Sequence, residues 1–142
     1  MKNSIDIEIK VPNQTRYLSM IGRIGEDLIR ELSTYSGDRE ALAHHLNVVL
    51  TEATVNAIKH ASETDKRKEV LIRISITNTE IAIKVYDSGC GFDLSQIADP
   101  CFEPEGLHES GRGIFIIRSL MDSVEYKKIN GGNVLVMKKT LC

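Results

Sequence analysis

The segment TEATVNAIKHA (residues 51–61) lies late in a long helical run and is the most informative stretch of this sequence. On a helix, Glu52, Asn56 and His60 recur at every fourth position, so a carboxylate, an amide and an imidazole lie in one line along one face. The side chains beside that line are small: Ala53 and Ala57. We interpret the segment as a helix whose polar line contacts a bulky group. The alternative is a surface stripe whose spacing arose by chance.

Two later segments place glycines beside apolar elements. In VYDSGCGFD (residues 85–93), Asp87 and two glycines follow an apolar strand. In SGRGIFIIRSLMD (residues 110–122), two glycines precede an apolar helix that we expect to begin at Ile114. A carboxylate at a strand end can accept a hydrogen bond from an amine, and the free N–H groups at a helix start attract anions. Asp87 also suits an ordinary turn, and a glycine string alone is a weak signal.

Together, the three segments resemble the N, G1 and G2 boxes of the histidine-kinase-like ATPase superfamily. Within that superfamily, the pattern E-A-x-x-N-A-x-x-H-A in a small chain is most similar to the anti-sigma factor serine-protein kinases of bacteria. The resemblance covers nearly the whole chain and rests on three ordered motifs, which are far more specific than one glycine motif. It implies a two-layer α/β sandwich, with ATP and Mg²⁺ held between the helices and the sheet.

The resemblance also implies a role for each motif residue. Glu52 matches the general base, and Asn56 matches the ligand of the Mg²⁺ ion that bridges the phosphates. Asp87 matches the residue that binds the adenine amino group. Arg112 would add charge near the phosphates or face solvent, and His60 would lie near the nucleotide or serve as a capping or core histidine. The nucleotide-binding residues that the resemblance implies are Asn56, His60, Asp87, Gly89, Gly91, Gly111, Arg112, Gly113 and Ile114.

Two positions depart from the family pattern. Glu109 stands two residues before Gly111, where some members carry an Arg that meets the γ-phosphate; other members also lack this Arg. Asn133 follows the turn glycine, where a Thr near the adenine is common. The first departure bears on kinase activity, so a regulatory module that holds ATP without phosphorylating a partner stays open as an alternative.

Hydropathy patterning predicts a single domain over residues 1–142 with the element order β-α-α-β-β-loop-α-β-β. Asn13 is a possible cap for the first helix, and Asp38 is the predicted cap for the second. Strands that pair by hairpins imply a mainly antiparallel mixed sheet covered by helices on one face, an α+β fold. The predicted strands are 4–11, 70–77, 81–85, 124–129 and 134–138, and the predicted helices are 15–35, 38–61 and 114–121.

Composition limits the class of protein. The chain has 142 residues, of which 42% are apolar and 27% charged, as in ordinary soluble domains. Its formal net charge of −2 provides no field for nucleic acid or an anionic membrane, and no apolar run approaches the ~20 residues of a membrane span. Charges also fill the N-terminal stretch, where a signal peptide needs an apolar core. We therefore expect a cytoplasmic protein whose three cysteines, Cys90, Cys101 and Cys142, are free thiols.

The leading hypothesis is a bacterial anti-sigma factor that uses ATP to phosphorylate a serine of a small anti-anti-sigma protein. The resemblance implies these partners, a sigma factor and an anti-anti-sigma protein, together with a homodimer that we expect to be held through strand 4–11 and the first helix. The aperiodic residues 92–110 are expected to form a lid over the phosphates. A sensor histidine kinase or a gyrase-type ATPase ranks lower, because we find no phosphoacceptor helix and no second domain with a catalytic lysine.

Overall fold

The computed structural model describes residues 4–32, 35–60, 69–87, 109–129 and 132–141, with only the backbone described at residues 60 and 109–112. Apart from the short 3₁₀ helix η1, the order of elements confirms the prediction. The elements are β1 (Ile5–Pro12), η1 (Thr15–Tyr17), α1 (Leu18–Arg30), α2 (Arg39–His60), β2 (Glu69–Ile76), β3 (Glu80–Asp87), α3 (Glu109–Leu120), β4 (Ser123–Ile129) and β5 (Gly132–Thr140).

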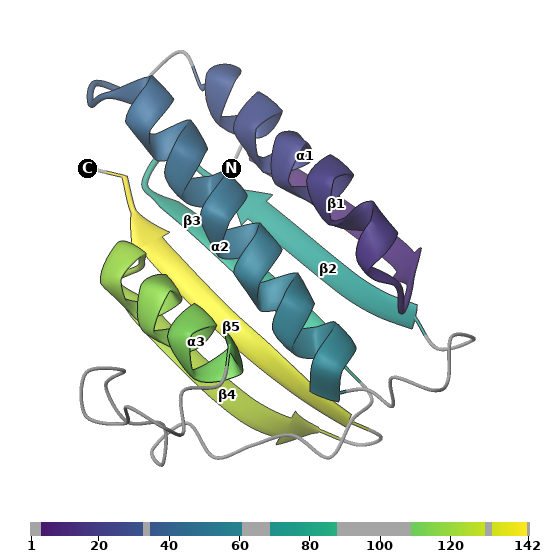
Figure 1. The fold of residues 1–142 in the computed structure, drawn as a ribbon. Coiled ribbons are helices and arrows are strands. Elements are labelled where there is room, and N and C mark those ends of the chain that lie inside the picture. Colours follow the sequence, from purple (N-terminus) through teal and green to yellow (C-terminus); the bar gives the residue numbers. More distant parts are fainter. Residues whose placement is uncertain (1–3, 33–34, 61–68, 88–108, 130–131, 142) are drawn as a thin grey trace.

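The strands form one open sheet in the order β1-β2-β3-β5-β4. Each pair of neighbours in this sheet is antiparallel, so the mainly antiparallel character is confirmed, and the described strands include no parallel pair that would make the sheet mixed. α1, α2 and α3 lie side by side on one face, which gives the predicted two-layer α+β sandwich (Figure 1). The connection from β3 to β4 passes through α3 and leaves β5 between the two strands.

The core lies between the helices and the sheet. β2 and β3 alternate between more buried and more exposed positions along their length, as the sequence predicts for strands covered on one face. α2 crosses the middle of the sheet (Figure 1) and adds its own buried aliphatic side chains. Burying each of these side chains contributes roughly 1.5–3 kcal/mol, so α2 is held firmly on the sheet. The fully or almost fully buried side chains of these elements include Leu46, Val49, Leu50, Ile72, Ile74, Ile81, Ile83 and Val85.

The two predicted helix caps have different outcomes. The Ala41 N–H donates a hydrogen bond to Asp38 Oδ1 over an N–O distance of 3.1 Å, so Asp38 caps α2 as predicted. The prediction for Asn13 is wrong, because Gln14 and Tyr17 occupy the N-cap positions of η1 and α1. Neither of those two residues makes a side-chain capping bond, so the start of α1 depends on packing.

α1 ends at Arg30, short of the predicted end at residue 35. The N–H groups of Glu31 and Leu32 bond to carbonyls three residues back, at N–O distances of 3.2 and 3.0 Å. Such bonds tighten the last turn and satisfy carbonyl groups that the helix leaves free at its end. The apolar periodicity beyond Arg30 therefore reflects packing of the chain after the helix, rather than helix itself.

Close packing of α1 on α2 sets the orientation of α2. A Cβ atom added at Gly22 would lie 2.5 Å from Asn47 Oδ1, and one added at Gly25 would lie 2.5 Å from Leu50 Cδ1. Glycine at both positions thus permits a short distance between the helices. Asn47 Nδ2 also donates a hydrogen bond to Glu26 Oε2 across the pair, at 2.5 Å. These contacts fix the rotation of α2 about its axis, and with it the direction in which its polar line faces.

Composition led to two expectations, one about membrane-spanning segments and one about the three cysteines. Across the described ranges, none of the helices combines the length and apolar character needed to cross a membrane. Cys90, Cys101 and Cys142 lie outside the described residues, so their state as free thiols stays a prediction.

Candidate functional site

The polar line occupies one continuous helix. α2 runs without a break from Arg39 to His60, so Glu52 and Asn56 lie one turn apart on the same face, as predicted. Glu52 is half-buried, whereas Asn56 is only 3% exposed. The side chain of His60 lies outside the described residues, and its role stays a prediction.

α3 packs a glycine directly against this line. A Cβ atom added at Gly113 would lie 2.7 Å from Glu52 Oε1 and 3.4 Å from Asn56 Nδ2. The neighbouring Ile114 is completely buried in the core and anchors α3 to the sheet. At the other end of α3, Lys139 Nζ donates to the carbonyl oxygen of the last residue at 3.0 Å. The structure therefore brings the first and third motifs together, as the sequence predicts.

The start of α3 differs from the prediction. The helix begins at Glu109 rather than at Ile114, so Gly111, Arg112 and Gly113 lie within its first turns. The first four N–H groups of an α-helix, counted from the N-cap residue, have no partner inside the helix, and here the last of them belongs to Gly111. Through the backbone, Gly111 can thus offer an N–H group to an anion, whereas Arg112, Gly113 and Ile114 cannot. Glycine in a helix costs about 1 kcal/mol relative to Ala, and the close contact with α2 offsets that cost.

Asp87 ends β3 in a nearly buried position. Its side chain is 7% exposed, and it accepts hydrogen bonds on both carboxylate oxygens. Asn133 Nδ2 donates to Oδ1 at 3.0 Å, and the Tyr126 hydroxyl donates to Oδ2 at 3.3 Å. Asp87 and Asn133 are register partners in the β3–β5 pair, which explains the first contact. The sequence analysis placed Asn133 near the adenine site but missed Tyr126. The alternating pattern of its strand does not reveal that Tyr126 contacts Asp87, which lies far away in the sequence.

Asn56 carries the clearest sign of an absent partner. Both polar atoms of its amide are buried, and neither forms a hydrogen bond in the structure. Buried polar groups are almost always hydrogen-bonded, so an exception of this kind points to an ion or ligand. Its carbonyl oxygen, with the Glu52 carboxylate one turn away, suits Mg²⁺, which prefers oxygen ligands and takes phosphates and waters as the others. Among the described residues, no group of three or more His, Cys, Asp or Glu could hold a metal.

Part of the predicted site cannot be compared with the structure. Gly89 and Gly91 lie outside the described residues, as does nearly all of the predicted lid at 92–110. The side chains of Glu109 and Arg112 also lie outside them. The roles assigned to these residues therefore stay predictions.

A separate groove of about 270 Å³ lies on the sheet away from the motif residues. It runs across β1, β2 and β3 and has acidic side chains from β1 on one side, with basic ones from β2 and β3 on the other. The charged residues that line it are Asp6, Glu8, Arg73 and Lys84. None of the motif residues lines it, and the candidate site lies instead where α3 packs against α2.

Comparison with known proteins identifies the family to which the chain is similar. Residues 12–139 match the histidine kinase-like ATPase domain family. The chain is 32% identical to the serine-protein kinase RsbW of Bacillus subtilis, over 97% of this chain and 88% of that protein. It is 38% identical to an anti-sigma F factor of Clostridium perfringens, over 68% of this chain and 71% of that protein.

A solved structure supports the fold. The histidine kinase domain of a blue-light-activated histidine kinase from Erythrobacter litoralis aligns with a TM-score of 0.51 and 18% identity. The alignment covers 92% of this chain but only 62% of that one, so this chain spans less than two thirds of the solved protein. With the first and third motifs in contact, and with the family match over nearly all of its length, this chain belongs to the histidine kinase-like ATPase domain family.

Proposed function

We propose that this protein is an ATP-dependent serine kinase that acts as an anti-sigma factor and phosphorylates a serine of an anti-anti-sigma protein. The observation that carries the proposal is the buried amide of Asn56, unsatisfied beside Glu52 and closely covered by Gly113. Such an arrangement suits a phosphate–metal centre better than a structural core. The names of the relatives, a serine-protein kinase and an anti-sigma factor, agree with this activity.

Asp87, Asn56 and Glu52 each have a defined role in the proposed reaction. The carboxylate of Asp87 accepts a hydrogen bond from the adenine amino group, and the amide oxygen of Asn56 would hold Mg²⁺. When bound, the ion would neutralise charge on the phosphates. Glu52 accepts the proton of the serine hydroxyl as its oxygen bonds to the γ-phosphorus and the bond to the β-phosphate oxygen breaks. Phosphoryl transfer of this kind relies on positioning and on charge stabilisation.

A non-catalytic module is the second candidate function. Glu109 occupies a position where some family members carry an Arg for the γ-phosphate, and a carboxylate there would repel that phosphate. In this alternative the protein binds ATP and sequesters a partner but transfers no phosphate. A direct assay of phosphate transfer separates the two candidates.

The assay uses radioactively labelled ATP and purified candidate anti-anti-sigma proteins encoded nearby. Glu52→Gln keeps the shape of the side chain and removes the base, so transfer should fall by about 10²–10⁴-fold while ATP still binds. Glu40→Gln is the matched control, because Glu40 is an exposed residue in the first turn of the same helix. Transfer at the wild-type rate by Glu52→Gln would remove Glu52 as the base, and ATP binding without any transfer by the wild type would favour the non-catalytic module.

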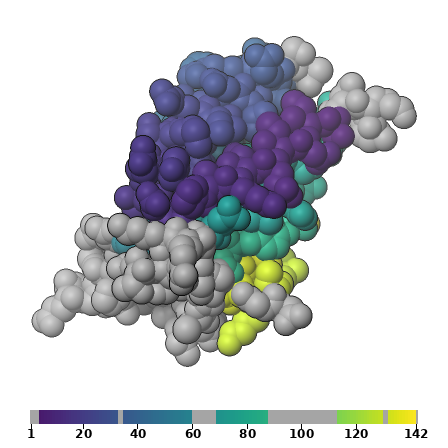
Figure 2. Space-filling view, turned by 90° about the vertical axis from the view of Figure 1, so that its right-hand side faces the viewer, coloured from purple at the N-terminus to yellow at the C-terminus, as the bar shows by residue number. Residues whose placement is uncertain are grey.

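The proposal also covers assembly and location. β1 is an edge strand of the sheet and runs along the surface beside α1 (Figure 2). Exposed strand edges pair readily with other chains, and so we propose a homodimer held through β1 and α1 that grips one sigma factor. A cytoplasmic location belongs to the same proposal, since ATP and sigma factors are both found there.

A further inference from the structure

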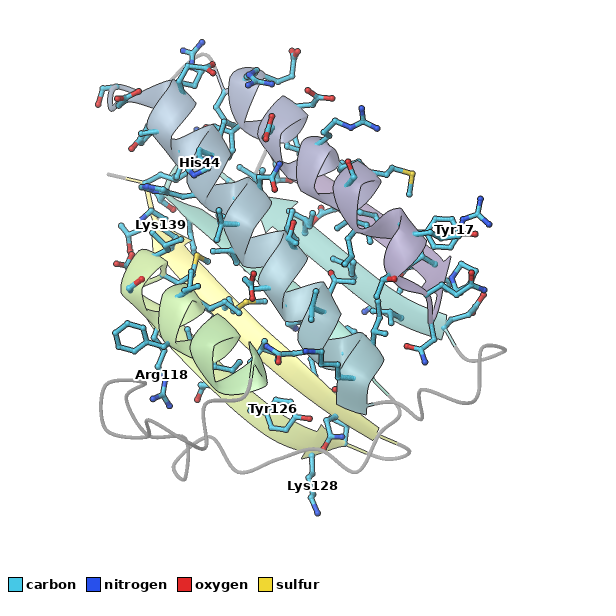
Figure 3. The ribbon with its side chains drawn as sticks, in the orientation of Figure 1. Tyr17, His44, Arg118, Tyr126, Lys128 and Lys139 are labelled. Atoms are coloured by element: carbon cyan, nitrogen blue, oxygen red, sulfur yellow. The ribbon has the colours of Figure 1, made fainter. Side chains whose placement is uncertain are left out.

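Tyr126 of the edge strand β4 points toward the carboxylate of Asp87, the last residue of β3. Tyr126 pairs with Leu135 of β5, a core residue, so its side chain lies on the helix-covered side of the sheet (Figure 3). Its hydroxyl donates to Asp87 Oδ2 at 3.3 Å, from 39 residues away in the sequence. Asn133 holds the other oxygen at 3.0 Å. Three strands thus contribute to one hydrogen-bonded cluster.

We propose that Tyr126 is a positioning residue for nucleobase recognition. Together with Asn133, it holds the Asp87 carboxylate in the orientation that accepts the amino group of adenine. The inference rests on the proposed nucleotide-binding function, and it adds a determinant from β4 that none of the three motifs contains. Tyr126 acts through Asp87 and makes no contact with the chemistry of phosphate transfer.

The physical reason lies in the freedom of an aspartate side chain. The terminal torsion of Asp is broad, so a carboxylate held at one oxygen can still turn. Each carboxylate oxygen can accept more than one hydrogen bond, and donors on both oxygens restrict the rotation of the group. A group that is already oriented loses less entropy when the ligand binds. Donors on both oxygens therefore make the carboxylate of Asp87 a prepared acceptor.

A simpler role for Tyr126 predicts a different outcome. A carboxylate at 7% exposure needs hydrogen bonds to offset the loss of water, and Tyr126 could do no more than that. In that case, its removal would disturb the pocket for any nucleotide. A positioning role instead affects only those ligands that use Asp87, so the selectivity for the base distinguishes the two roles.

The experiment compares ATP with purine riboside triphosphate, which lacks the amino group that Asp87 is proposed to bind. Calorimetry measures both affinities for the wild type and for Tyr126→Phe. We expect Tyr126→Phe to weaken ATP binding by roughly 5–30-fold, the range for one lost hydrogen bond, and to leave the affinity for the analogue unchanged. Tyr86→Phe is the matched control, because Tyr86 precedes Asp87 on the same strand and its ring lies instead beneath Arg73, at 5.7 Å.

Each other result overturns the inference. An equal loss for both nucleotides would mean that Tyr126 only supports the pocket, and unchanged ATP affinity would mean that its hydrogen bond does not matter. A wild-type protein that binds ATP and the analogue equally would remove Asp87 as a reader of the base, and one that binds neither would overturn the proposed function itself. Thermal unfolding of each variant sets a titration temperature well below its midpoint, so that every affinity is measured on folded protein.

Discussion

Gly113→Ala is the sharpest test of the contact between α3 and the polar line of α2. The added Cβ would lie 2.7 Å from Glu52 Oε1, whereas an ordinary contact is about 3.4 Å or more, so the carboxylate must retreat by about 0.7 Å. The same Cβ would lie 3.4 Å from Asn56 Nδ2, which is an acceptable contact. The substitution therefore displaces the proposed base and leaves the proposed metal ligand in place.

The expected effects on stability and on activity differ in size. Alanine is favoured over glycine within a helix by about 1 kcal/mol, whereas forcing an extra methyl group into a packed site costs about 1–3 kcal/mol. The group that must move is the end of a flexible side chain, so we expect the low end of that cost and a net change within about 1 kcal/mol. For a chain of this length that corresponds to a shift in Tm of at most about 3–5 °C. A base displaced by most of an ångström, in contrast, should slow phosphate transfer by roughly 10–100-fold.

Three measurements on Gly113→Ala check these magnitudes together. Thermal unfolding reports stability, calorimetry reports ATP affinity, and transfer from labelled ATP reports activity. Ser119→Ala serves as the control, because it lies on the same helix but faces solvent. Normal transfer by Gly113→Ala would refute the placement of Glu52 as the base, and a large loss of stability would refute the claim that the contact is with a movable carboxylate.

The remaining predictions concern binding, acid sensitivity and assembly. Asp87→Asn should weaken ATP binding by roughly 1–3 kcal/mol, as calorimetry would measure. Asn56→Ala should make ATP affinity independent of Mg²⁺, and a retained magnesium dependence would point to another ligand. The Thr140 N–H donates to Asp122 Oδ2 at 2.6 Å and lowers the pKa of that carboxyl. A lowered folded-state pKa means that the stability from Asp122 is present above its unfolded pKa and is lost as the pH falls through the folded pKa. Asp122→Asn should therefore reduce the fall in urea midpoint on acidification below about pH 4. Sedimentation equilibrium at micromolar concentration should give a dimer mass with and without ATP, and a clean monomer mass would remove the dimer.

Local patterns in the sequence were sufficient for the strands and for the polar line. Alternation along β2 and β3 reflects a sheet covered on one face, and Asp38 caps α2 because a capping bond spans only three residues. The spacing of Glu52 and Asn56 follows from the helical repeat alone. Each of these features depends on neighbours in the chain, which is why a single sequence reveals it.

Features that depend on distant contacts were not predictable in the same way. The glycines at 111 and 113 suggested a loop, yet α3 extends through them because Gly113 must approach α2 closely. The bond from Tyr126 to Asp87 depends on β5 lying between β3 and β4, an order that hairpin patterns leave open. α1 likewise ends earlier than predicted because its last turn is tightened, and apolar periodicity does not reveal such a turn.

The unsatisfied amide of Asn56 connects the stability of this fold to its proposed function. A buried polar group without a partner costs about 1–3 kcal/mol, a large share of the roughly 5–15 kcal/mol that stabilises a typical domain. An aliphatic side chain at this position of α2 would avoid that cost, since Ala53 and Ala57 beside it are already part of the core. A ligand that satisfies the amide returns the lost energy on binding, and at a concentration 100 times its Kd it adds about 2.7 kcal/mol of stability. Under the proposed function, the buried amide of Asn56 is thus a local weakness of the free protein that bound nucleotide would repair.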